Sequence, residues 1–220
     1  MIKENVSRIL QDIPKTVELV GAAKTRSPSE MLEALEGGLQ IIGHNYVKEA
    51  ELAFQAIDYR AKWHMIGHLQ SNKVKKAVAL FDMIETVDSF KLAKAIDQAC
   101  LKHAKSMPIL IEINSAEEGQ KAGVLPINAI SLVEKIAQLK NIKIMGLMTM
   151  GPAISSQEDC RPYFVRVYRL FEELKKKDNK AFEMKYLSMG MSSSYKVAIE
   201  EGANIIRLGT KLFGPRANKS

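Results

Sequence analysis

Residues 40–67, QIIGHNYVKEAELAFQAIDYRAKWHMIG, contain the repeating unit that decides the fold. A short apolar run at Gln40–His44 is followed by a segment of helical period at Tyr46–Ala56 and by a second apolar run at Trp63–Gly67. Short runs rich in branched and aromatic residues predict strands, whereas apolar residues spaced three and four apart predict a helix. We therefore expect a strand–helix–strand unit here, with its two strands parallel.

The same alternation extends along the whole chain. Strands are predicted at Val17–Lys24, Gln40–His44, Trp63–Gly67, Met83–Val87, Ile109–Asn114, Ile142–Thr149, Tyr186–Met189 and Asn204–Leu208. Helices are predicted between them at Ser29–Glu36, Tyr46–Ala56, Lys73–Leu80, Phe90–His103, Pro126–Leu139, Gln157–Lys176 and Ser192–Glu201. Eight strands separated by helices indicate an α/β protein with a parallel sheet, and the number eight favours a TIM-type (β/α)8 barrel. A doubly wound open sheet is the alternative, with its site where the strand order reverses.

The two ends of the chain bear on how the barrel is completed. The segment KLFGPRANKS, about ten residues, follows the last predicted strand, so an eighth helix barely fits. A helix at Ile2–Gln11 is expected to cover that gap. The sequence has no long linker or repeat, and residues 1–220 are expected to form one domain. Gly151–Asp159 is predicted to be a loop on the active face of the barrel.

The composition is that of an ordinary globular protein, 46% hydrophobic and 26% charged. No apolar run approaches the roughly 20 residues that span a bilayer, and the N-terminus lacks the apolar core of a signal peptide. Cys100 and Cys160 form no close metal-binding pair, and we expect reduced thiols in a cytoplasmic protein. The net charge of +7 is dispersed and accompanies no nucleic-acid-binding motif. A basic nucleic-acid or protein-binding module is therefore a minor alternative.

Polar residues gather at the C-terminal ends of the predicted strands, where a barrel of this type places its function. Lys24 ends the apolar stretch VELVGAAK. A lysine held against apolar surface loses hydration, which disfavours its charged form, and a neutral amine can form an imine with an aldehyde. Taken alone, the position of Lys24 favours a surface lysine just past a strand over a reactive amine.

Two turns after the last two predicted strands have the character of phosphate sites. In SMGMSSS, Gly190 permits a tight turn and Ser192 is predicted to cap the next helix, whose backbone N–H groups would face an anion. In RLGT, Gly209 permits close backbone approach and Thr210 supplies a hydroxyl. The turns after strands seven and eight are the usual phosphate position in such barrels. Arg207 lies inside the last strand and needs a partner, either a carboxylate or a ligand.

A metal site is not predicted. His64 and His68 are four residues apart, but they lie in a strand-to-loop region rather than on one helix, and no acidic ligand is close in sequence.

Seven segments occur in the order and spacing of a known family: VGAAKTRSP, GHNYVKEA, WHMIGHLQSNK, LIEIN, GLMTM, LSMGMS and IIRLGTKLFG. They resemble the pyridoxal phosphate homeostasis proteins, which are relatives of the alanine racemase N-terminal barrel. The resemblance runs from about Val20 to Gly214. It implies an alanine racemase N-terminal-like barrel and the cofactor pyridoxal 5′-phosphate (PLP).

The resemblance also implies a role for each matching residue. Lys24 is expected to form the Schiff base with PLP, and Arg207 to point at the pyridine nitrogen. The remaining cofactor-binding residues that it implies are Ser192, Gly209 and Thr210 at the phosphate, Asn45 in the pocket wall and Ser188 nearby.

The chain departs from the family pattern at several positions. His44 replaces a common glutamate, and Ser193, Ser194 and Lys196 occupy a stretch in which acidic residues are common. These departures affect the outer electrostatics of the pocket and any partner surface.

The function that the resemblance implies is PLP binding for intracellular PLP homeostasis. Such a protein would buffer or carry the cofactor, deliver it to apo PLP-dependent enzymes, and influence the balance of amino acids and keto acids. The racemases it resembles use a second acid–base tyrosine from another domain, which this chain is expected to lack. Tyr46 and Tyr195 are assigned structural roles in preference to acid–base roles.

A non-enzymatic, monomeric protein is therefore expected, with a low-activity PLP-dependent amino-acid racemase as the alternative. An arginine at the pyridine nitrogen stays charged, which leaves that nitrogen neutral and weakens carbanion stabilisation without forbidding racemisation.

Overall fold

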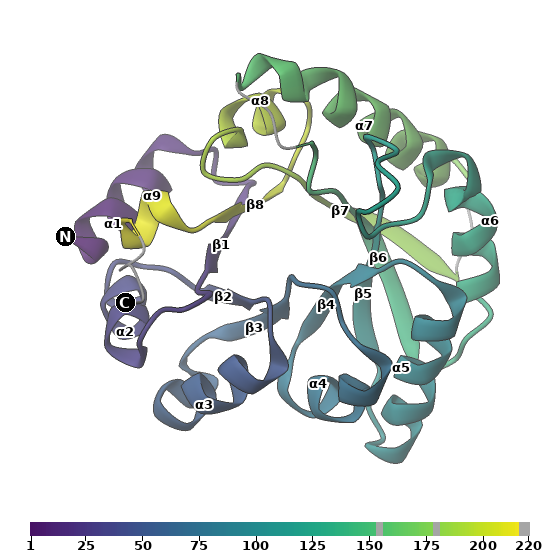
Figure 1. Cartoon of the computed structure of the whole chain (residues 1–220), viewed down its shortest axis with the longest axis horizontal. Helices are drawn as coiled ribbons and strands as arrows, with labels where there is room; N and C mark the ends of the chain where they lie inside the picture. The colour runs from purple at the N-terminus through teal and green to yellow at the C-terminus, as the bar shows by residue number, and fades with distance from the viewer. Residues whose placement is uncertain (153–155, 178–180, 216–220) are drawn as a thin grey trace.

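The computed structural model describes residues 1–152, 156–177 and 181–215. Its strands are all parallel and close into a barrel in chain order (Figure 1). They are β1 (Glu18–Ala22), β2 (Ile41–His44), β3 (Lys62–Met65), β4 (Met83–Val87), β5 (Met107–Glu112), β6 (Ile142–Met148), β7 (Phe182–Ser188) and β8 (Ile205–Leu208). The TIM-type barrel is confirmed and the open sheet is wrong, because β1 pairs with both β2 and β8.

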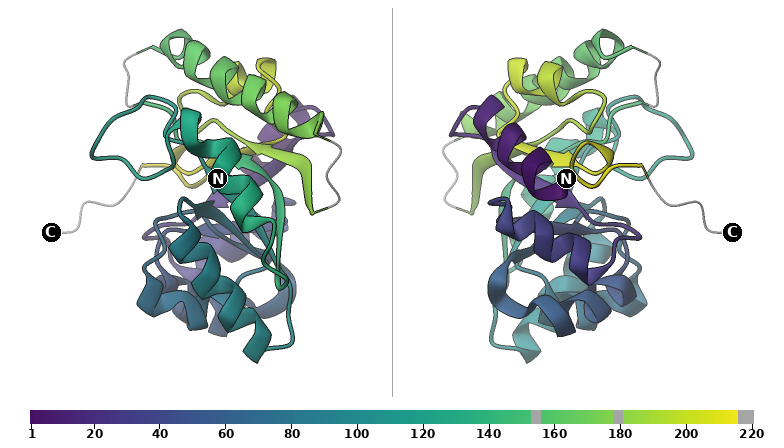
Figure 2. Two further views of the ribbon diagram at one scale, coloured as in Figure 1. Left: turned by 90° about the vertical axis from the view of Figure 1, so that its right-hand side faces the viewer. Right: turned by 90° about the vertical axis from the view of Figure 1, so that its left-hand side faces the viewer.

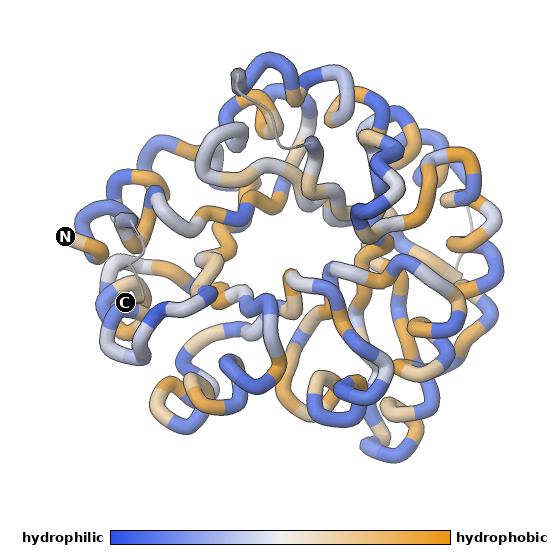
Figure 3. The backbone as a smooth tube through the Cα atoms, in the orientation of Figure 1, coloured by the Kyte–Doolittle hydropathy of each residue, from blue (hydrophilic) through white to orange (hydrophobic). Residues whose placement is uncertain are grey.

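The helices form an outer layer around the strands (Figures 1 and 2). They are α1 (Ile2–Asp12), α2 (Pro28–Glu36), α3 (Val47–Ile57), α4 (Val74–Leu80), α5 (Phe90–Lys102), α6 (Pro126–Ile136), α7 (Arg161–Lys175), α8 (Tyr195–Glu200) and α9 (Thr210–Phe213). Three short 3-10 turns, η1 (Asp58–Arg60), η2 (Ser71–Lys73) and η3 (Glu158–Cys160), precede β3, α4 and α7. Figure 3 shows hydrophobic and hydrophilic residues alternating along the helices, as amphipathic packing on a barrel requires.

Several strand boundaries differ from the prediction by two residues or more, and β7 and β5 are the clearest cases. β7 begins at Phe182 rather than at Tyr186, because Glu183 and Lys185 alternate outward to solvent and hide the start of the strand in the sequence. β5 begins at Met107 and ends at Glu112, two residues before the predicted end. Both shifts arise because a strand end is set by pairing with its neighbours, which local composition does not record.

The N-terminal helix covers the gap in the outer layer, as predicted. The last helix, α9, is a single short turn, and α1 packs against both α2 and α9 (Figure 2). The Asn5 side-chain amide donates a hydrogen bond of 3.1 Å to the carbonyl of Leu212. The segment before β1 thus completes the shell beside β8. The predicted loop Gly151–Asp159 includes residues 153–155, which lie outside the described residues.

The apolar core has three clusters. The largest lies between strands and helices and includes Trp63, Phe81 and Phe164. A second lies inside the barrel, where Val20 and Ile205 pack together, and a third contains Leu110 and Met145. Above this inner cluster the barrel interior is charged, since the buried set also contains Glu85, Glu112 and Arg207. The closed barrel therefore concentrates polar chemistry at the C-terminal ends of its strands.

The described residues contain neither a disulfide nor a membrane-spanning helix. Cys100 and Cys160 are buried and free. No helix in the described ranges is long and apolar enough to cross a bilayer.

Candidate functional site

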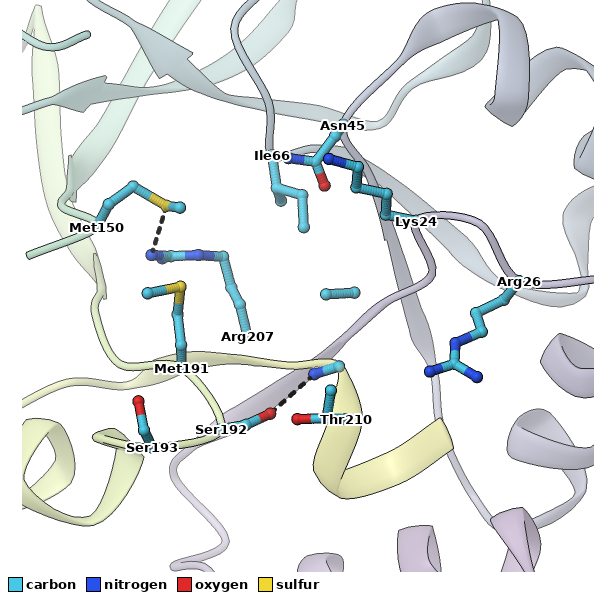
Figure 4. Close-up of a pocket in the computed structure, with 12 residues that line it drawn as sticks. Lys24, Arg26, Asn45, Ile66, Met150, Met191, Ser192, Ser193, Arg207 and Thr210 are labelled. Carbon is cyan, nitrogen blue, oxygen red and sulfur yellow. Dashed lines mark hydrogen bonds between the residues drawn. The ribbon is translucent and has the colours of Figure 1, made fainter. Parts of the chain in front are cut away.

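A pocket of about 440 Å³ opens at the C-terminal ends of the strands (Figure 4). It is lined by side chains that follow different strands, which is the arrangement of a barrel active site. The lining residues are Ala22, Lys24, Arg26, Asn45, Ile66, Met150, Met191, Ser192, Ser193, Arg207, Gly209 and Thr210. Six of the seven predicted site residues therefore meet in one pocket. Ser188 does not line it.

Lys24 stands at one side of the pocket, two residues after β1. Its side chain is half-buried and extends toward Asn45 at the end of β2 (Figure 4). The Lys24 Nζ lies 5.2 Å from the centroid of the Tyr46 ring, a cation–π distance. The residue that follows, Thr25, has a φ of 66°, a strained left-handed conformation for a β-branched residue. This turn redirects the chain directly after Lys24.

The two predicted phosphate turns lie side by side on the opposite wall. Ser192 follows β7, and its Oγ accepts hydrogen bonds from the backbone N–H groups of Gly209 (3.2 Å) and Lys211 (3.4 Å), which follow β8. The hydroxyl and these amides converge on one corner of the pocket. Thr210 lies beside them (Figure 4).

The prediction that Ser192 caps the next helix is wrong. Helix α8 begins at Tyr195, and the residue before it is Ser194, whose Oγ accepts the N–H of Met191 at 3.2 Å. Ser192 is instead drawn across the barrel end by the amides of Gly209 and Lys211, which is a tertiary contact. The tight turn predicted at Gly190 is confirmed, with a φ of 89°.

Gly209 leaves free space inside the pocket. A Cβ built on Gly209 would meet only the Ala22 carbonyl oxygen at 3.5 Å and the Ala22 Cβ at 3.7 Å, which are ordinary contacts. Ala22 lines the same pocket, so a side chain at Gly209 would occupy space that a ligand needs.

Arg207 forms the floor of the pocket, and only 3% of its surface is exposed. Its Nη1 donates to the Ser188 hydroxyl at 2.5 Å, and its Nη2 donates to the Thr149 carbonyl at 2.8 Å. Nη1 also lies 3.8 Å from Oε2 of Glu85. Burial lowers the pKa of Arg207 from its ordinary value, and the charges of Glu85 and Glu112 oppose this effect. Arg207 therefore has a carboxylate partner, and it also lines the pocket.

Glu85, in β4, is the centre of the buried network. Its Oε2 accepts the Ser188 hydroxyl at 2.6 Å, and its Oε1 lies 2.7 Å from Nδ1 of His64. Burial alone would raise the pKa of Glu85, but the hydrogen bond from His64 and the charges of His64 and Arg207 outweigh burial and lower it. Glu85 is therefore a carboxylate that holds Arg207 in place through Ser188.

This network also accounts for the histidines. His64 is buried with Glu85 as its partner, whereas His68 is mostly exposed and lies 3.9 Å from Asp88. Within the described ranges no group of three or more His, Cys, Asp or Glu side chains is placed to hold a metal ion.

Sequence reasoning missed Glu85, Thr149 and Glu112. The signal was present for Glu85 and Glu112, since each is the only charged residue in its predicted strand. A buried charge requires a partner, and Arg207 in β8 is the only arginine in a predicted strand. The sequence does not show that these strands face each other across a closed barrel.

Comparison with known proteins places the chain in a family. A sequence model described as alanine racemase, N-terminal domain, matches residues 1–217. The chain belongs to this family. A relative in Aquifex aeolicus (strain VF5), named pyridoxal phosphate homeostasis protein, is 40% identical over 224 residues, which cover 97% of each chain. A relative of the same name in Mus musculus is 35% identical, over 98% of this chain and 83% of its own.

A solved structure agrees with this family. The structure of PipY from Synechococcus elongatus PCC7942 with PLP bound has a TM-score of 0.89 and 30% sequence identity, over 97% of this chain and 100% of that chain. Within the alanine racemase N-terminal domain family, the chain thus belongs with the pyridoxal phosphate homeostasis proteins.

Departures from the family pattern lie mostly outside the pocket. His44 is buried on the outer side of the barrel, where its ring stacks on Trp63 with centroids 5.7 Å apart. Neither ring nitrogen of His44 has a hydrogen-bond partner, and burial lowers its pKa to about 4. Ser194 is buried and Lys196 exposed, and only Ser193 lines the pocket.

The tyrosines considered as acid–base groups differ in position. Tyr195 is buried at the start of α8 and does not line the pocket. Tyr46 is about half exposed and lies beside Lys24 rather than across the pocket from it.

Proposed function

We propose that this chain binds pyridoxal 5′-phosphate in the pocket at the barrel mouth and functions in PLP homeostasis. The observation that carries the proposal is the convergence in one pocket of Lys24, Arg207 and the corner formed by Ser192 and Gly209. PLP supplies an aldehyde that condenses with an amine, forming a C=N bond and releasing water. The residues present fit such a group, because an amine, a buried cation and a set of N–H and O–H groups surround one cavity.

Each residue has a proposed part in holding the cofactor. Lys24 would carry the aldehyde carbon as a Schiff base. Ser192, Gly209 and Thr210 would bind the phosphate, because backbone N–H and hydroxyl groups suit an anion. Arg207 would face the pyridine nitrogen, held in place by Glu85 through Ser188. Asn45 would form the wall beside Lys24.

The pocket favours holding the cofactor over racemisation. Racemisation needs a proton donor or acceptor on each face of a planar intermediate. Among the described residues that line the pocket, Lys24 is the only side chain with an amine, carboxyl, phenol, imidazole or thiol group. The curated relatives compared above are named homeostasis proteins. A low-activity racemase remains the competing function, and exchange of amino-acid α-protons for solvent deuterium would support it.

We also propose the wider setting of this function. Residues 1–220 would act as one PLP-binding domain, since α1 packs against α2 and α9 in the shell of a barrel that runs from β1 to β8. The protein would be a cytoplasmic monomer that passes PLP to apo enzymes. Large exposed hydrophobic side chains of the described residues support a monomer, because they are spread over separate elements, as with Leu52, Leu101 and Ile127.

The decisive experiment is reduction with borohydride followed by peptide mapping. The protein with PLP should show the absorbance of an imine, and reduction should attach the cofactor to the peptide that contains Lys24. Lys24→Ala should lose this adduct, whereas Lys48→Ala, a change at an exposed lysine on α3, should keep it. If Lys24→Ala kept the same reducible adduct, the assignment of Lys24 would be wrong.

A further inference from the structure

A second cavity, of about 240 Å³, lies beside the PLP pocket at the ends of β5 and β6. Its lining includes Glu112, Lys121 and Thr149, none of which lines the first pocket. Met150 lines both cavities, and its sulfur lies 3.6 Å from Nη2 of Arg207. The cavity is smaller than the roughly 300–1,000 Å³ typical of pockets for drug-sized ligands, so it suits a small molecule.

Glu112 is the unusual group in this cavity. Only 6% of its surface is exposed, and its Oε2 has no hydrogen-bond partner. Buried polar atoms in native proteins are almost always hydrogen-bonded, and an unpaired one is destabilising. The carboxyl group of Glu112 is therefore a buried acceptor in the wall of this cavity, and one of its oxygens lacks a donor.

The other polar groups of the wall already have partners. The hydroxyls of Ser115 and Thr149 lie 3.0 Å apart, and the Thr149 hydroxyl donates to the Ile113 carbonyl at 2.9 Å. The Asn114 amide donates to the carbonyl of Glu118 at 2.8 Å, which closes the loop after β5. These bonds make the wall rigid and leave Glu112 dependent on a donor from a ligand.

Lys121 contributes an ammonium group to the wall of the cavity. Its Nζ lies 2.8 Å from Oε1 of Glu118 and 3.3 Å from the Gly151 carbonyl, and its side chain is about one-third exposed. An ammonium group has three donors, so Lys121 keeps one for another acceptor. The cavity therefore has one carboxyl group and one ammonium group in its wall.

We propose that this cavity binds a small α-amino acid, whose ammonium group bonds to Glu112 and whose carboxylate bonds to Lys121. A molecule with both charges satisfies both side chains, whereas an amine or an acid alone satisfies one. The ammonium also supplies the donor that Glu112 Oε2 lacks. This site goes beyond PLP binding, and binding at it does not require the cofactor.

Calorimetric titration of the PLP-loaded, borohydride-reduced protein tests the proposal. Reduction locks the cofactor on Lys24, so an added amino acid cannot exchange with that lysine, and any heat reports the second cavity. Glycine, L-alanine and D-alanine are the probes, with propylamine and propionate as molecules of similar size that carry one charge. We expect at least one amino acid to bind about ten-fold or more tightly than either single-charge probe.

Matched variants locate the binding. Glu112→Gln and Lys121→Met should each weaken amino-acid binding about ten-fold or more, whereas Glu117→Gln, in an exposed ion pair with Arg166, should not. Lys121→Met keeps the test valid if Glu112→Gln alters folding. The proposal is overturned if no amino acid binds, if Glu112→Gln and Lys121→Met bind as the wild type does, or if propionate or propylamine binds as tightly.

The test separates this proposal from the PLP assignment. If borohydride attaches no cofactor to Lys24, the PLP assignment fails, and the same titration on the untreated protein still decides the second cavity.

Discussion

The carboxylate of Glu85 and the guanidinium of Arg207 lie 3.8 Å apart, although they come from β4 and β8, on opposite sides of the closed barrel. The hydroxyl of Ser188 joins them, since it donates to Glu85 and accepts from Arg207. The three side chains form a fully buried bridge beneath the pocket. The position of Arg207 at the pocket floor therefore depends on the negative charge of Glu85, which lies behind it.

Glu85→Gln should destabilise the protein strongly. Removing one partner of a buried ion pair leaves the other charge uncompensated, which costs about 3–5 kcal/mol. The control is Glu183→Gln, which breaks an exposed ion pair with Lys143 and should cost less than about 1 kcal/mol. Denaturant titration of both variants gives the two free energies of unfolding. Equal effects would show that Glu85 does not hold Arg207 in place.

Ser192→Ala should weaken binding of PLP but not of pyridoxal, which lacks the phosphate. A hydrogen bond to a charged group contributes about 1.5–3 kcal/mol, so we expect a loss of roughly 10- to 100-fold in PLP affinity. Ser131→Ala is the matched control, because Ser131 is exposed on α6 and does not line the pocket. Fluorescence or absorbance titration with both compounds measures the difference. Loss of affinity for pyridoxal as well would place Ser192 away from the phosphate.

Glu112→Gln should increase stability at neutral and alkaline pH. Burial, with a smaller effect of Asp88, raises the pKa of Glu112 from 4.5 to about 7, and Arg207 acts in the opposite direction. The folded state therefore holds an extra proton between about pH 4.5 and 7, and stability falls as pH rises through this window. The gain from the variant should grow from pH 5 to pH 8, to at most about 3 kcal/mol.

Unfolding measured across that pH range checks the effect of Glu112, with Glu117→Gln as the exposed control. A gain that does not change with pH would contradict the raised pKa.

His44→Leu should protect the protein against mild acid. Burial lowers the pKa of His44 from 6.5 to about 4, so the unfolded chain binds the extra proton between these values. Wild-type stability should therefore fall as pH falls from 6.5 toward 4, by at most about 3 kcal/mol from this residue. The variant should lose less, whereas His103→Leu, at an exposed histidine, should behave as the wild type does. Thermal unfolding from pH 7 to pH 4.5 makes the comparison.

Much of the fold could be predicted from the sequence. The alternation of short apolar runs with helical segments is a local property, and it correctly located all eight strands. The helix predicted at the N-terminus is present as α1, which packs against α2 and α9. Lys24, Ser192 and Gly209 were predicted to lie together because they follow strand ends, and the C-terminal ends of parallel strands meet at one face; in the structure they line one pocket.

Only the tertiary structure decided how the site is supported. Glu85 and Arg207 are 122 positions apart in the sequence, and they meet because closure of the barrel brings β4 and β8 to the same interior layer. Ser192 was predicted to cap a helix, but its hydroxyl instead contacts a backbone amide of the turn after β8. Barrel closure brings these two turns together. The cavity beside Glu112 depends on which face of β5 turns inward. Such contacts arise from strand register and barrel closure, which no local pattern of residues encodes.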